Sequence, residues 1–429
     1  MNIKPDVEKA YDAIAAKQPV QNSLFAYYDG KQPTIYAGKY ISGLLEGKSK
    51  SFTQNWCAMV IDSELDRLNL RGFSAEKAAA TKAMQAIWDT NEIDLESDSV
   101  HEAALITGES FAIVWADDGK NVEVYYNDPR MCHMQYNPEK PREKLWAAKR
   151  WVGIDGHMYI TIYYPDRLEH WRSSKTADKE TSGSSFDAIG EPVKNPYGEV
   201  PVFHFRSRRR NAQSDLDNVT SLQDAVNVLL TDMMATAEYN AFPQRYIISS
   251  GDLDELKNAP AEVWDLAQGV GGEGETKVGQ FAAANLNIYT DAIDKLASSI
   301  GVITRTPKHY FFGEGGSNLS GEALIAMEAP LNAKVTDRID VLTPVWRKLM
   351  AFALTVGGAK KVDPLTIMPE FDEPATIQPR TAAEITAIRV TAGMPLTSAL
   401  RLEGMDNAQI EQIDADMASF GTVEEDDSE

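Results

Sequence analysis

The chain has 429 residues, and this length predicts two or three domains of about 100–200 residues each. Hydrophobic residues make up 43% and charged residues 25%, which is typical of a globular protein and argues against wholesale disorder. The formal net charge of −22 disfavours a tight, sequence-reading DNA binder, because such proteins carry basic residues that neutralise phosphates. It is compatible with a protein past which DNA slides without sticking.

Neither membrane insertion nor export is expected. No apolar run reaches the ~18 residues of a membrane span, and the first residues lack the apolar core of a secretory signal. Cys57 and Cys132 are too few for a disulfide framework, which fits a reducing cytoplasm. Residues 402–429 hold ten acidic residues and no Lys or Arg, and we interpret them as a solvated, partly frayed tail.

The first half of the chain predicts helices followed by strands. Residues 1–110 have apolar residues at helical spacing between roughly 7 and 17 and between 75 and 92, with Ser74 as the expected N-cap of the second helix. From Phe111 to Phe205, short β-branched and aromatic runs between turn signals predict an antiparallel β region. These runs cover residues 111–115, 122–126, 146–152, 158–164 and 200–205. Residues 173–199 are rich in Ser, Thr, Lys, Gly and Pro, and we expect a long loop there.

The second half predicts three longer helices. Residues 214–241 contain no Gly or Pro and carry an apolar stripe, so we expect a helix that Pro243 ends. The stripe consists of Leu216, Val219, Leu222, Val226, Leu229 and Met233. A short αβ insert over 244–288, with a strand at 245–248, precedes a second helix over about 289–303. A third helix over 320–356 contains Pro330 and Pro344, which should kink it, and small helices follow a Pro-rich connector.

No motif predicts a catalytic, cofactor or metal site. Residues 269–274 match G-x-G-x-x-G but follow no predicted strand, and Glu275 stands where a P-loop needs Lys, so we interpret them as a flexible loop. The six His residues lack metal-binding spacing, and no Ser lies in a G-x-S-x-G elbow. We therefore expect a protein that is not an enzyme and binds no cofactor.

Two basic clusters leave their roles open. The cluster Arg206-Ser207-Arg208-Arg209-Arg210 fits a contact with phosphate or an acidic partner, or alternatively a solvated turn or ion pairs between subunits. Arg305, Lys308 and His309 precede a Gly-rich segment, and alone they would be interpreted as surface residues.

Several short motifs follow one another in a fixed order along the chain. They are Tyr27-Tyr28-Asp29-Gly30, Asn55-Trp56-Cys57, 66–73, 87–91, 104–111, Val200-Pro201-Val202, 221–227, Phe242-Pro243-Gln244-Arg245 and 319–324. In this order, over roughly residues 20–400, the chain resembles the portal proteins of long-tailed bacteriophages, specifically the family typified by that of the siphophage SPP1. The Gly-rich loop after Lys308 and the Arg206–Arg210 cluster depart from that family's pattern.

The resemblance implies an α+β portal fold and a ring, usually of twelve subunits. An α/β wing would comprise residues 1–213, a two-helix stem 214–242 and 289–304, and a small α/β clip 243–288. A tunnel loop over 305–319, a long kinked helix over 320–370 returning to the wing, and a helical crown with the acidic tail over 371–429 would complete the subunit. Independently, two amphipathic helices that flank an insert cannot bury their stripes on each other alone, so neighbouring subunits are expected.

The implied function is a ring at a capsid vertex of the virion, assembled in the host bacterial cytoplasm, through which viral DNA is packaged and ejected. The implied partners are further copies of the chain, double-stranded DNA without sequence specificity, terminase, scaffold, major capsid protein and a head–tail adaptor, but no membrane. The tunnel-loop residues expected to face DNA are Arg305, Lys308, His309, Phe311, Phe312 and Asn318. The alternative is another structural head or head–tail joining protein; a packaging motor would need the P-loop that is missing.

Overall fold

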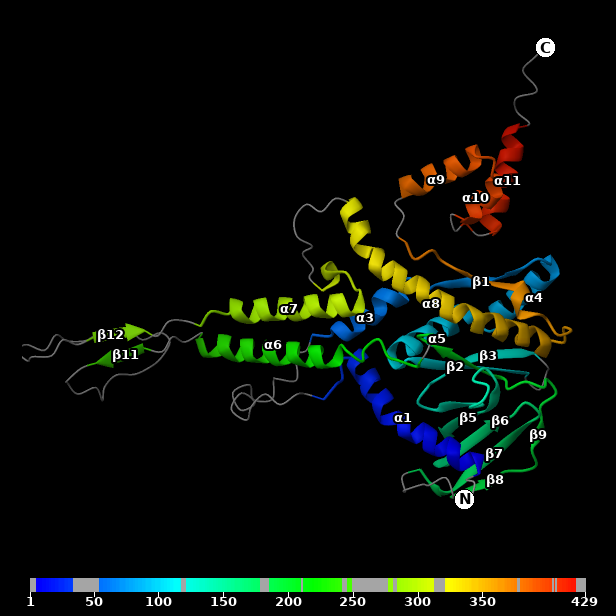
Figure 1. Cartoon of the computed structure of the whole chain (residues 1–429), viewed down its shortest axis with the longest axis horizontal. Helices are drawn as coiled ribbons and strands as arrows, with labels where there is room; N and C mark the ends of the chain where they lie inside the picture. The colour runs from blue at the N-terminus through cyan, green and yellow to red at the C-terminus, as the bar shows by residue number, and fades with distance from the viewer. Residues whose placement is uncertain are drawn as a thin grey trace, which may run out of the picture. The chain divides into compact units, whose positions relative to one another are not determined.

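The computed structural model describes most of the chain as helices and strands arranged in two compact units (Figure 1). The described residues are 5–33, 54–116, 121–177, 185–209, 211–240, 245–248, 277–280, 284–311, 321–375, 379–402, 405 and 407–421. Unit 1 combines Met1–Phe25, Val60–Asp215 and Arg305–Glu429, and unit 2 combines Ala26–Met59 and Leu216–Thr304. The predicted mixture of helices and sheets is confirmed, and each unit is assembled from distant stretches of sequence.

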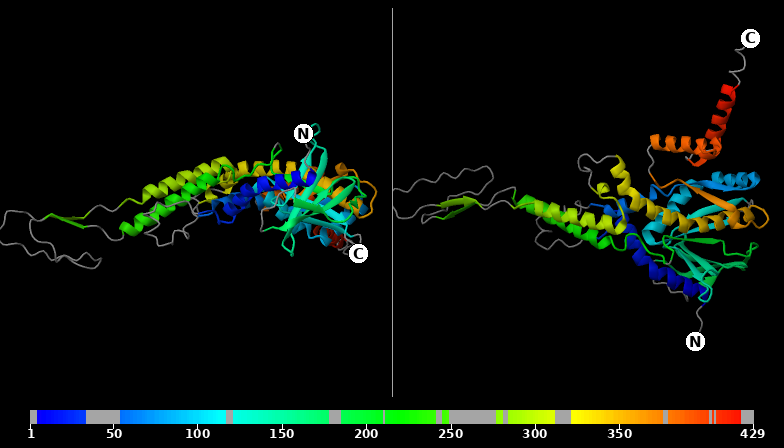
Figure 2. Two further views of the ribbon diagram at one scale, coloured as in Figure 1. Left: turned by 90° about the horizontal axis from the view of Figure 1, so that it is seen from below. Right: turned by 45° about the horizontal axis from the view of Figure 1, so that its top comes forward.

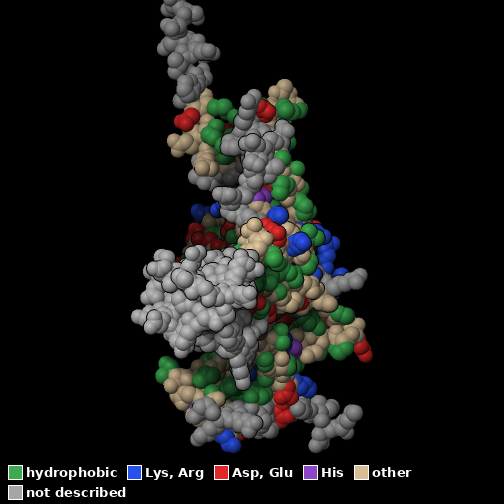
Figure 3. Space-filling view, turned by 90° about the vertical axis from the view of Figure 1, so that its left-hand side faces the viewer, with side chains coloured by type: hydrophobic (Ala, Val, Ile, Leu, Met, Phe, Trp, Pro, Cys, Tyr) green, Lys and Arg blue, Asp and Glu red, His purple; other side chains and the backbone are tan. Residues whose placement is uncertain are grey.

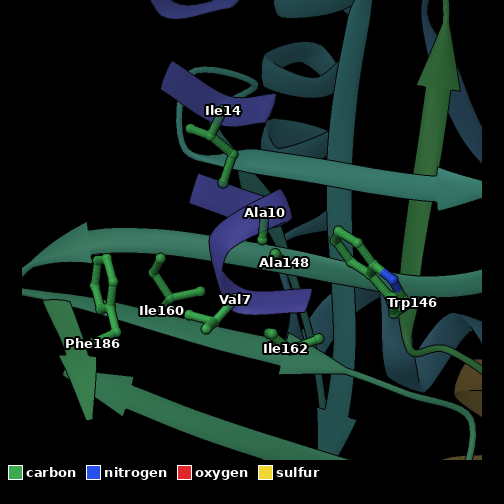
Figure 4. Close-up of a cluster of buried hydrophobic side chains, with 8 residues drawn as sticks. All are labelled: Val7, Ala10, Ile14, Trp146, Ala148, Ile160, Ile162 and Phe186. Atoms are coloured by element: carbon green, nitrogen blue, oxygen red, sulfur yellow. The ribbon is translucent and has the colours of Figure 1, made fainter. Parts of the chain in front are cut away.

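The largest sheet of unit 1 is antiparallel and carries a helix on one face. Its strands run in the order β4 (Cys132–Tyr136), β5 (Lys144–Val152), β6 (His157–Tyr163), β7 (Arg167–Thr176) and β8 (Phe186–Ala188), and β9 (Val193–Lys194) also pairs with β7. Val7, Ala10 and Ile14 share one face of α1 (Asp6–Tyr28), because they are three and four residues apart. That face packs on the sheet side chains Trp146, Ala148, Ile160, Ile162 and Phe186 (Figure 4).

A second sheet of unit 1 packs one face on the largest sheet and the other on two helices. β2 (Glu109–Ala116) is its central strand, with β10 (Val202–Arg206) and β3 (Val122–Asn127) on either side. The first six residues of β2 are all buried, as expected for a strand covered on both faces. The helices that contact it are α5 (Ile93–Thr107) and α8 (Gly321–Val356), so the sheet lies within the core of unit 1.

The 36-residue helix α8 organises the rest of unit 1. Pro330 and Pro344 both lie inside it, as predicted, and its buried Trp346 packs against Phe73 and Phe205. Beside α8, β1 (Leu70–Ala75) pairs with β13 (Ile367–Phe371), which follows the short turn η4 (Pro364–Thr366). The small C-terminal helices are α9 (Pro379–Thr391), α10 (Leu396–Leu402) and α11 (Asn407–Gly421), and α10 contacts both others.

Unit 2 contains two neighbouring helices and a hairpin. The helices α6 (Thr220–Asn240) and α7 (Asn287–Thr304) lie side by side in each view of Figures 1 and 2, and the hydroxyls of Thr236 and Tyr289 are 3.1 Å apart between them. Between them in sequence, β11 (Arg245–Ile248) pairs with β12 (Lys277–Gln280). The strand predicted at 245–248 is confirmed, whereas the loop at 269–274 and its neighbour Glu275 lie outside the described residues. α3 (Trp56–Leu65) runs from unit 2 into unit 1.

Three expectations from the sequence are corrected. Ser74 is not an N-cap: it lies in β1 opposite Met368, and α4 (Ala78–Thr90) begins after Lys77. The first long helix starts at Thr220 instead of 214. The stretch 173–199 is not one long loop, because β7 extends to Thr176 and then pairs with β8 and β9. The small helices expected after the Pro-rich connector are present, and α11 extends to Gly421. In β1 and in β7 to β9, pairing with neighbouring strands overrides local composition.

Among the residues that the structure describes, no helix is both long and apolar enough to cross a membrane.

Candidate functional site

The segment that follows α7 leaves the helix abruptly. α7 ends at Thr304, and Arg305 has a φ of 62°, in the left-handed region that a helix commonly enters just after its last turn. Pro307, with a ψ of 137°, cannot continue a helix because it lacks an N–H. The short turn η3 (Lys308–Tyr310) follows, so the chain from Arg305 to Phe311 does not continue α7.

Four of the six predicted tunnel-loop residues lie on this segment. Arg305 and Lys308 are exposed, and the Nε2 of His309 lies 3.9 Å from the Oε1 of Glu328 in α8. Phe311 is only 6% exposed in the described subunit, where its apolar ring is favoured in the interior, and its assignment to the channel stays a prediction. Phe312 and Asn318 lie outside the described residues.

The basic cluster after β10 finds its partners within the same chain. The Arg206 guanidinium lies 5.8 Å from the centre of the Tyr136 ring. Arg208 donates to the Oδ1 of Asp215 at 3.1 Å, and the NH2 of Arg209 lies 3.2 Å from Asp340 and 3.5 Å from Asp337 in α8. Arg210 is outside the described residues. Ion pairs within the chain therefore account for Arg208 and Arg209, and those of Arg209 are exposed and weak.

A buried ionic cluster fastens α8 to the end of α3. The Arg338 guanidinium donates to both carboxylate oxygens of Asp215, at 2.7 and 2.8 Å, and its Nε lies 3.3 Å from the Oε2 of Glu64. Arg338 also donates to the backbone oxygen of Ser207 at 2.7 Å, and Lys334 forms an ion pair with Glu64. Removing one partner from such a buried cluster typically costs about 3–5 kcal/mol, because the other charge stays buried and unpaired.

The two carboxylates of this cluster respond differently to burial. Burial and the neighbouring Asp215 raise the pKa of Glu64 to about 7, although Lys334 and Arg338 oppose the shift. Burial also acts to raise the pKa of Asp215, but the positive charges of Lys334 and Arg338 hold it below its ordinary value.

A second buried network joins α1 to the sheets of unit 1. Glu109 accepts hydrogen bonds from the Lys17 ammonium at 2.5 Å, from Gln21 at 3.2 Å and from the Nε2 of His204 at 3.0 Å. Burial alone would raise the pKa of Glu109, but the His204 hydrogen bond and the charge of Lys17 lower it to about 2. Burial lowers the pKa of His204, so its neutral ring donates to Glu109 while its Nδ1 accepts from the Tyr136 hydroxyl at 3.1 Å.

The first turns of α6 hold the other pieces of unit 2. The Tyr27 hydroxyl donates to Asp224, with 2.9 and 2.8 Å to its two oxygens, and the Trp56 amide donates to the Oε1 of Gln223 at 2.8 Å. The Gln54 amide donates to the Oδ1 of Asn227 at 3.1 Å. Three of the motifs that carry the family resemblance, at 27–30, 55–57 and 221–227, therefore meet in one place.

The described residues offer little for covalent or metal chemistry. Burial raises the pKa of both thiols, Cys57 and Cys132, to about 12, so neither is a reactive thiolate near neutral pH. Burial lowers the pKa of His101 to about 4, and its neutral Nε2 accepts from the Trp346 indole at 3.0 Å. No group of three or more metal-ligating side chains occurs in the part of the chain that the structure describes.

Comparison with known proteins identifies the family. Residues 21–419 match the family described as "Phage portal protein, SPP1 Gp6-like". The portal protein of Mycobacterium phage D29 is 27% identical over 338 residues, covering 74% of this chain and 68% of that protein. The portal protein of Mycobacterium phage L5 is 26% identical over 348 residues, with the same coverage of both chains.

Two solved structures resemble this chain at a lower sequence identity. A chain from the neck of a native gene transfer agent particle, computed with C12 symmetry, has a TM-score of 0.49 and 11% identity, covering 90% of this chain and 99% of that one. A chain from the virion of the native particle has a TM-score of 0.47 and 11% identity, covering 87% of this chain and 96% of that one. Because the family match spans most of the sequence, the chain belongs to the SPP1 Gp6-like family of phage portal proteins.

Proposed function

We propose that this portal protein assembles into a closed ring of about twelve subunits at a capsid vertex, and that double-stranded viral DNA enters and leaves through the ring. Membership of the portal family is the main support for this proposal. The structural support for a ring is the set of exposed apolar side chains on α7.

Helix α7 leaves large apolar side chains in water when the subunit is alone. Ile288, Val302 and Ile303 are 67%, 81% and 51% exposed. On the neighbouring α6, Leu229 and Met233 of the predicted stripe are only half-buried. Exposed apolar side chains at both ends of α7 favour contact with another protein surface, and a repeated head-to-tail contact between identical subunits closes a ring.

The expected division of the subunit stays part of the proposal. Residues 1–213 are the wing, and 214–242 and 289–304 are the stem, supported by α6 and α7. Residues 243–288 are the clip, supported by the pairing of β11 with β12. The tunnel loop is 305–319, the long helix returning to the wing is 320–370, supported by α8, and the crown with the acidic tail is 371–429.

The acidic charge of the protein suits a conduit for DNA. A chain with a net charge of −22 repels phosphate, so a duplex would slide past without being captured. Arg305, Lys308 and His309, on the segment after α7, would make brief contacts with phosphates that salt screens. Such contacts read no base sequence, which agrees with transport of a whole genome.

The ring would act without catalysis and would join other proteins at the vertex. The proposed partners are terminase, scaffold and major capsid protein during assembly, and a head–tail adaptor in the finished virion. Basic, acidic and hydrophobic side chains are interspersed over the described residues of the face in Figure 3. A mixed surface of this kind fits contacts with proteins better than tight binding to nucleic acid.

The ring is tested by electron microscopy and light scattering of the purified protein. We expect particles with a central hole and about twelve times the monomer mass. A monomer or dimer at every concentration under assembly conditions would refute the ring.

The tunnel loop is tested by shortening residues 313–317 while keeping Phe311 and α8. Rings should still form, whereas the amount of DNA packaged or retained per particle should fall. If rings with the shortened segment package a full genome at the normal rate, the segment is only a connector.

A further inference from the structure

The side chains of Arg67, Tyr310 and Glu328 meet just after the end of α3. The NH2 of Arg67 donates to the Tyr310 hydroxyl at 2.7 Å, and this hydroxyl donates to the Oε1 of Glu328 at 3.1 Å. The same guanidinium forms an ion pair of 3.4 Å with the Oε2 of Glu328. Tyr310 precedes 312–320 and Glu328 follows it in the first turns of α8, so Arg67 contacts the chain on either side.

The cluster is largely removed from water. The side chains of Arg67 and Glu328 are each 15% exposed, and the Tyr310 ring is partly buried. The ring centre lies 5.9 Å from the guanidinium carbon of Arg67, and the His309 ring packs edge-on against Tyr310 with centroids 4.7 Å apart. Hydrogen bonds that involve a charged group are stronger than neutral ones, and partial burial strengthens them further.

Arg67 is itself held in place by α3. Its NH1 donates to the backbone oxygen of Ser63 at 3.1 Å, near the end of that helix. The neighbouring Glu64 is fixed to α8 by its ion pairs with Lys334 and Arg338. One planar guanidinium therefore bridges a fixed helix end, through NH1, and the Tyr310–Glu328 pair, through NH2. A Lys side chain, which carries a single ammonium, would not reproduce this fork.

We propose that Arg67 is a positioning residue of the portal, which fixes the two ends of residues 312–320 against the end of α3. Through Tyr310, it also sets the place of the preceding Lys308 and His309. The consequence for DNA rests on the proposed function of this segment as the tunnel loop. The positioning itself does not, because it follows from contacts within one subunit.

Four variants of the full-length protein test the proposal. Tyr310→Phe removes only the shared hydroxyl, and Glu328→Gln removes the negative charge but keeps the shape of the side chain. Arg67→Leu removes the positive charge, whereas Arg67→Lys keeps it. Arg71→Leu is the matched control, because Arg71 pairs with Asp372 at a site where its own side chain is 66% exposed. Amide hydrogen exchange is measured on assembled particles at residues 308–311 and 321–328, with β2 and β3 as the internal reference.

We expect exchange at 308–311 to become roughly tenfold faster in Tyr310→Phe and Arg67→Leu, because a partly buried charge-assisted hydrogen bond is lost. Arg67→Lys should recover part of this protection, and Arg71→Leu should match the wild-type protein. If Arg67→Leu does not fold, Tyr310→Phe and Glu328→Gln decide the question. Unchanged exchange at 308–311 in both of these variants would overturn the proposal.

DNA retention per particle separates the positioning role from the tunnel-loop assignment. We expect variants with faster exchange to retain less DNA while assembling normally, with Arg67→Lys intermediate. Faster exchange with normal DNA retention would leave the positioning role standing and would instead refute the assignment of this segment as the tunnel loop.

Discussion

Glu109 shows how unit 1 keeps a negative charge away from water. Three donors surround its carboxylate, two from α1 and one from β10, so the ionised form is favoured in spite of burial. The same contacts bind α1 to a sheet that lies about 90 residues further along the chain. The electrostatics of a single side chain therefore contribute to the attachment of a whole helix.

Replacing Glu109 with Gln should change how stability depends on pH. The pKa of Glu109 is lowered from 4.5 to about 2 in the folded protein, so its ionised form contributes stability above pH 4.5 that is lost as the pH falls towards 2. We expect Glu109→Gln to lower the free energy of unfolding by about 3 kcal/mol at pH 7. This difference from wild type should shrink towards zero at about pH 2, as measured by urea denaturation at a series of pH values.

The control is Glu199→Gln, because Glu199 pairs at 3.5 Å with the exposed Lys361. Its effect should stay within about 0.5 kcal/mol at every pH. A difference between wild type and Glu109→Gln that stays constant from pH 7 to pH 2 would contradict the predicted role of the carboxylate.

The buried ionic groups could not be predicted from the sequence. Lys334 and Arg338 are four residues apart on a helix, a pattern that usually indicates a solvated face. Their partners Glu64 and Asp215 lie 274 and 123 residues from Arg338, so only the fold brings them together. The basic residues Arg305, Lys308 and His309 were found from the sequence because they share one short segment. The contacts of Arg67 with Tyr310 and Glu328 were not.

At the scale of elements, the periodicity of apolar residues predicted the long helices and the most apolar strands. The five β-branched and aromatic runs overlap strands β2, β3, β5, β6 and β10, although the runs 158–164 and 200–205 each extend beyond their strand, and three long helices appear where they were expected. The strands β4 and β7 were missed, because they mix His, Gln, Arg, Glu and Ser with their apolar residues. Such strands are stabilised by their neighbours in the sheet more than by their own composition.

The junction between α5 and β2 depends on one glycine. Gly108 has a φ of 90°, and a Cβ there would lie 2.6 Å from the backbone carbon of Ala212 and would also clash with the amide nitrogen of Gln213. We expect Gly108→Ala to destabilise the protein by more than about 3 kcal/mol, because backbone strain and a backbone clash add together. Thermal and urea unfolding measure the loss.

Gly190→Ala separates the two causes. Gly190 also has a positive φ, of 68°, but a Cβ there meets nothing within 4 Å. Its substitution should cost only about 1–2 kcal/mol, the strain of the left-handed conformation. Equal losses at the two positions would show that the close approach of the Ala212–Gln213 backbone does not matter.

At the scale of the whole molecule, the exposed apolar residues of α7 should matter only in the assembly. Val302 is 81% exposed in the single subunit, so Val302→Asp should leave the stability of the subunit within about 0.5 kcal/mol of wild type. In the ring, a buried unpaired carboxylate would be costly, so we expect assembly to require at least about tenfold more protein. Light scattering over a concentration series measures this shift.

Ile154→Asp provides the comparison, because Ile154 is fully exposed on the turn between β5 and β6 in unit 1. It adds the same charge outside α7 and should leave the assembly concentration unchanged. Rings of Val302→Asp that form at the wild-type concentration would exclude this face of α7 from the subunit interface.

Each unit combines stretches that are far apart in the sequence, so its folding has to wait for the later stretch to be synthesised. Tyr27 leaves the ribosome 197 residues before its partner Asp224, which at roughly 5–20 residues per second is a delay of about 10–40 s. β1 likewise cannot pair until β13 has been synthesised, about 300 residues later. Neither unit can therefore close until most of the chain has been made. During that interval the apolar face of α1 and the first strands have only each other, or a chaperone, to cover them.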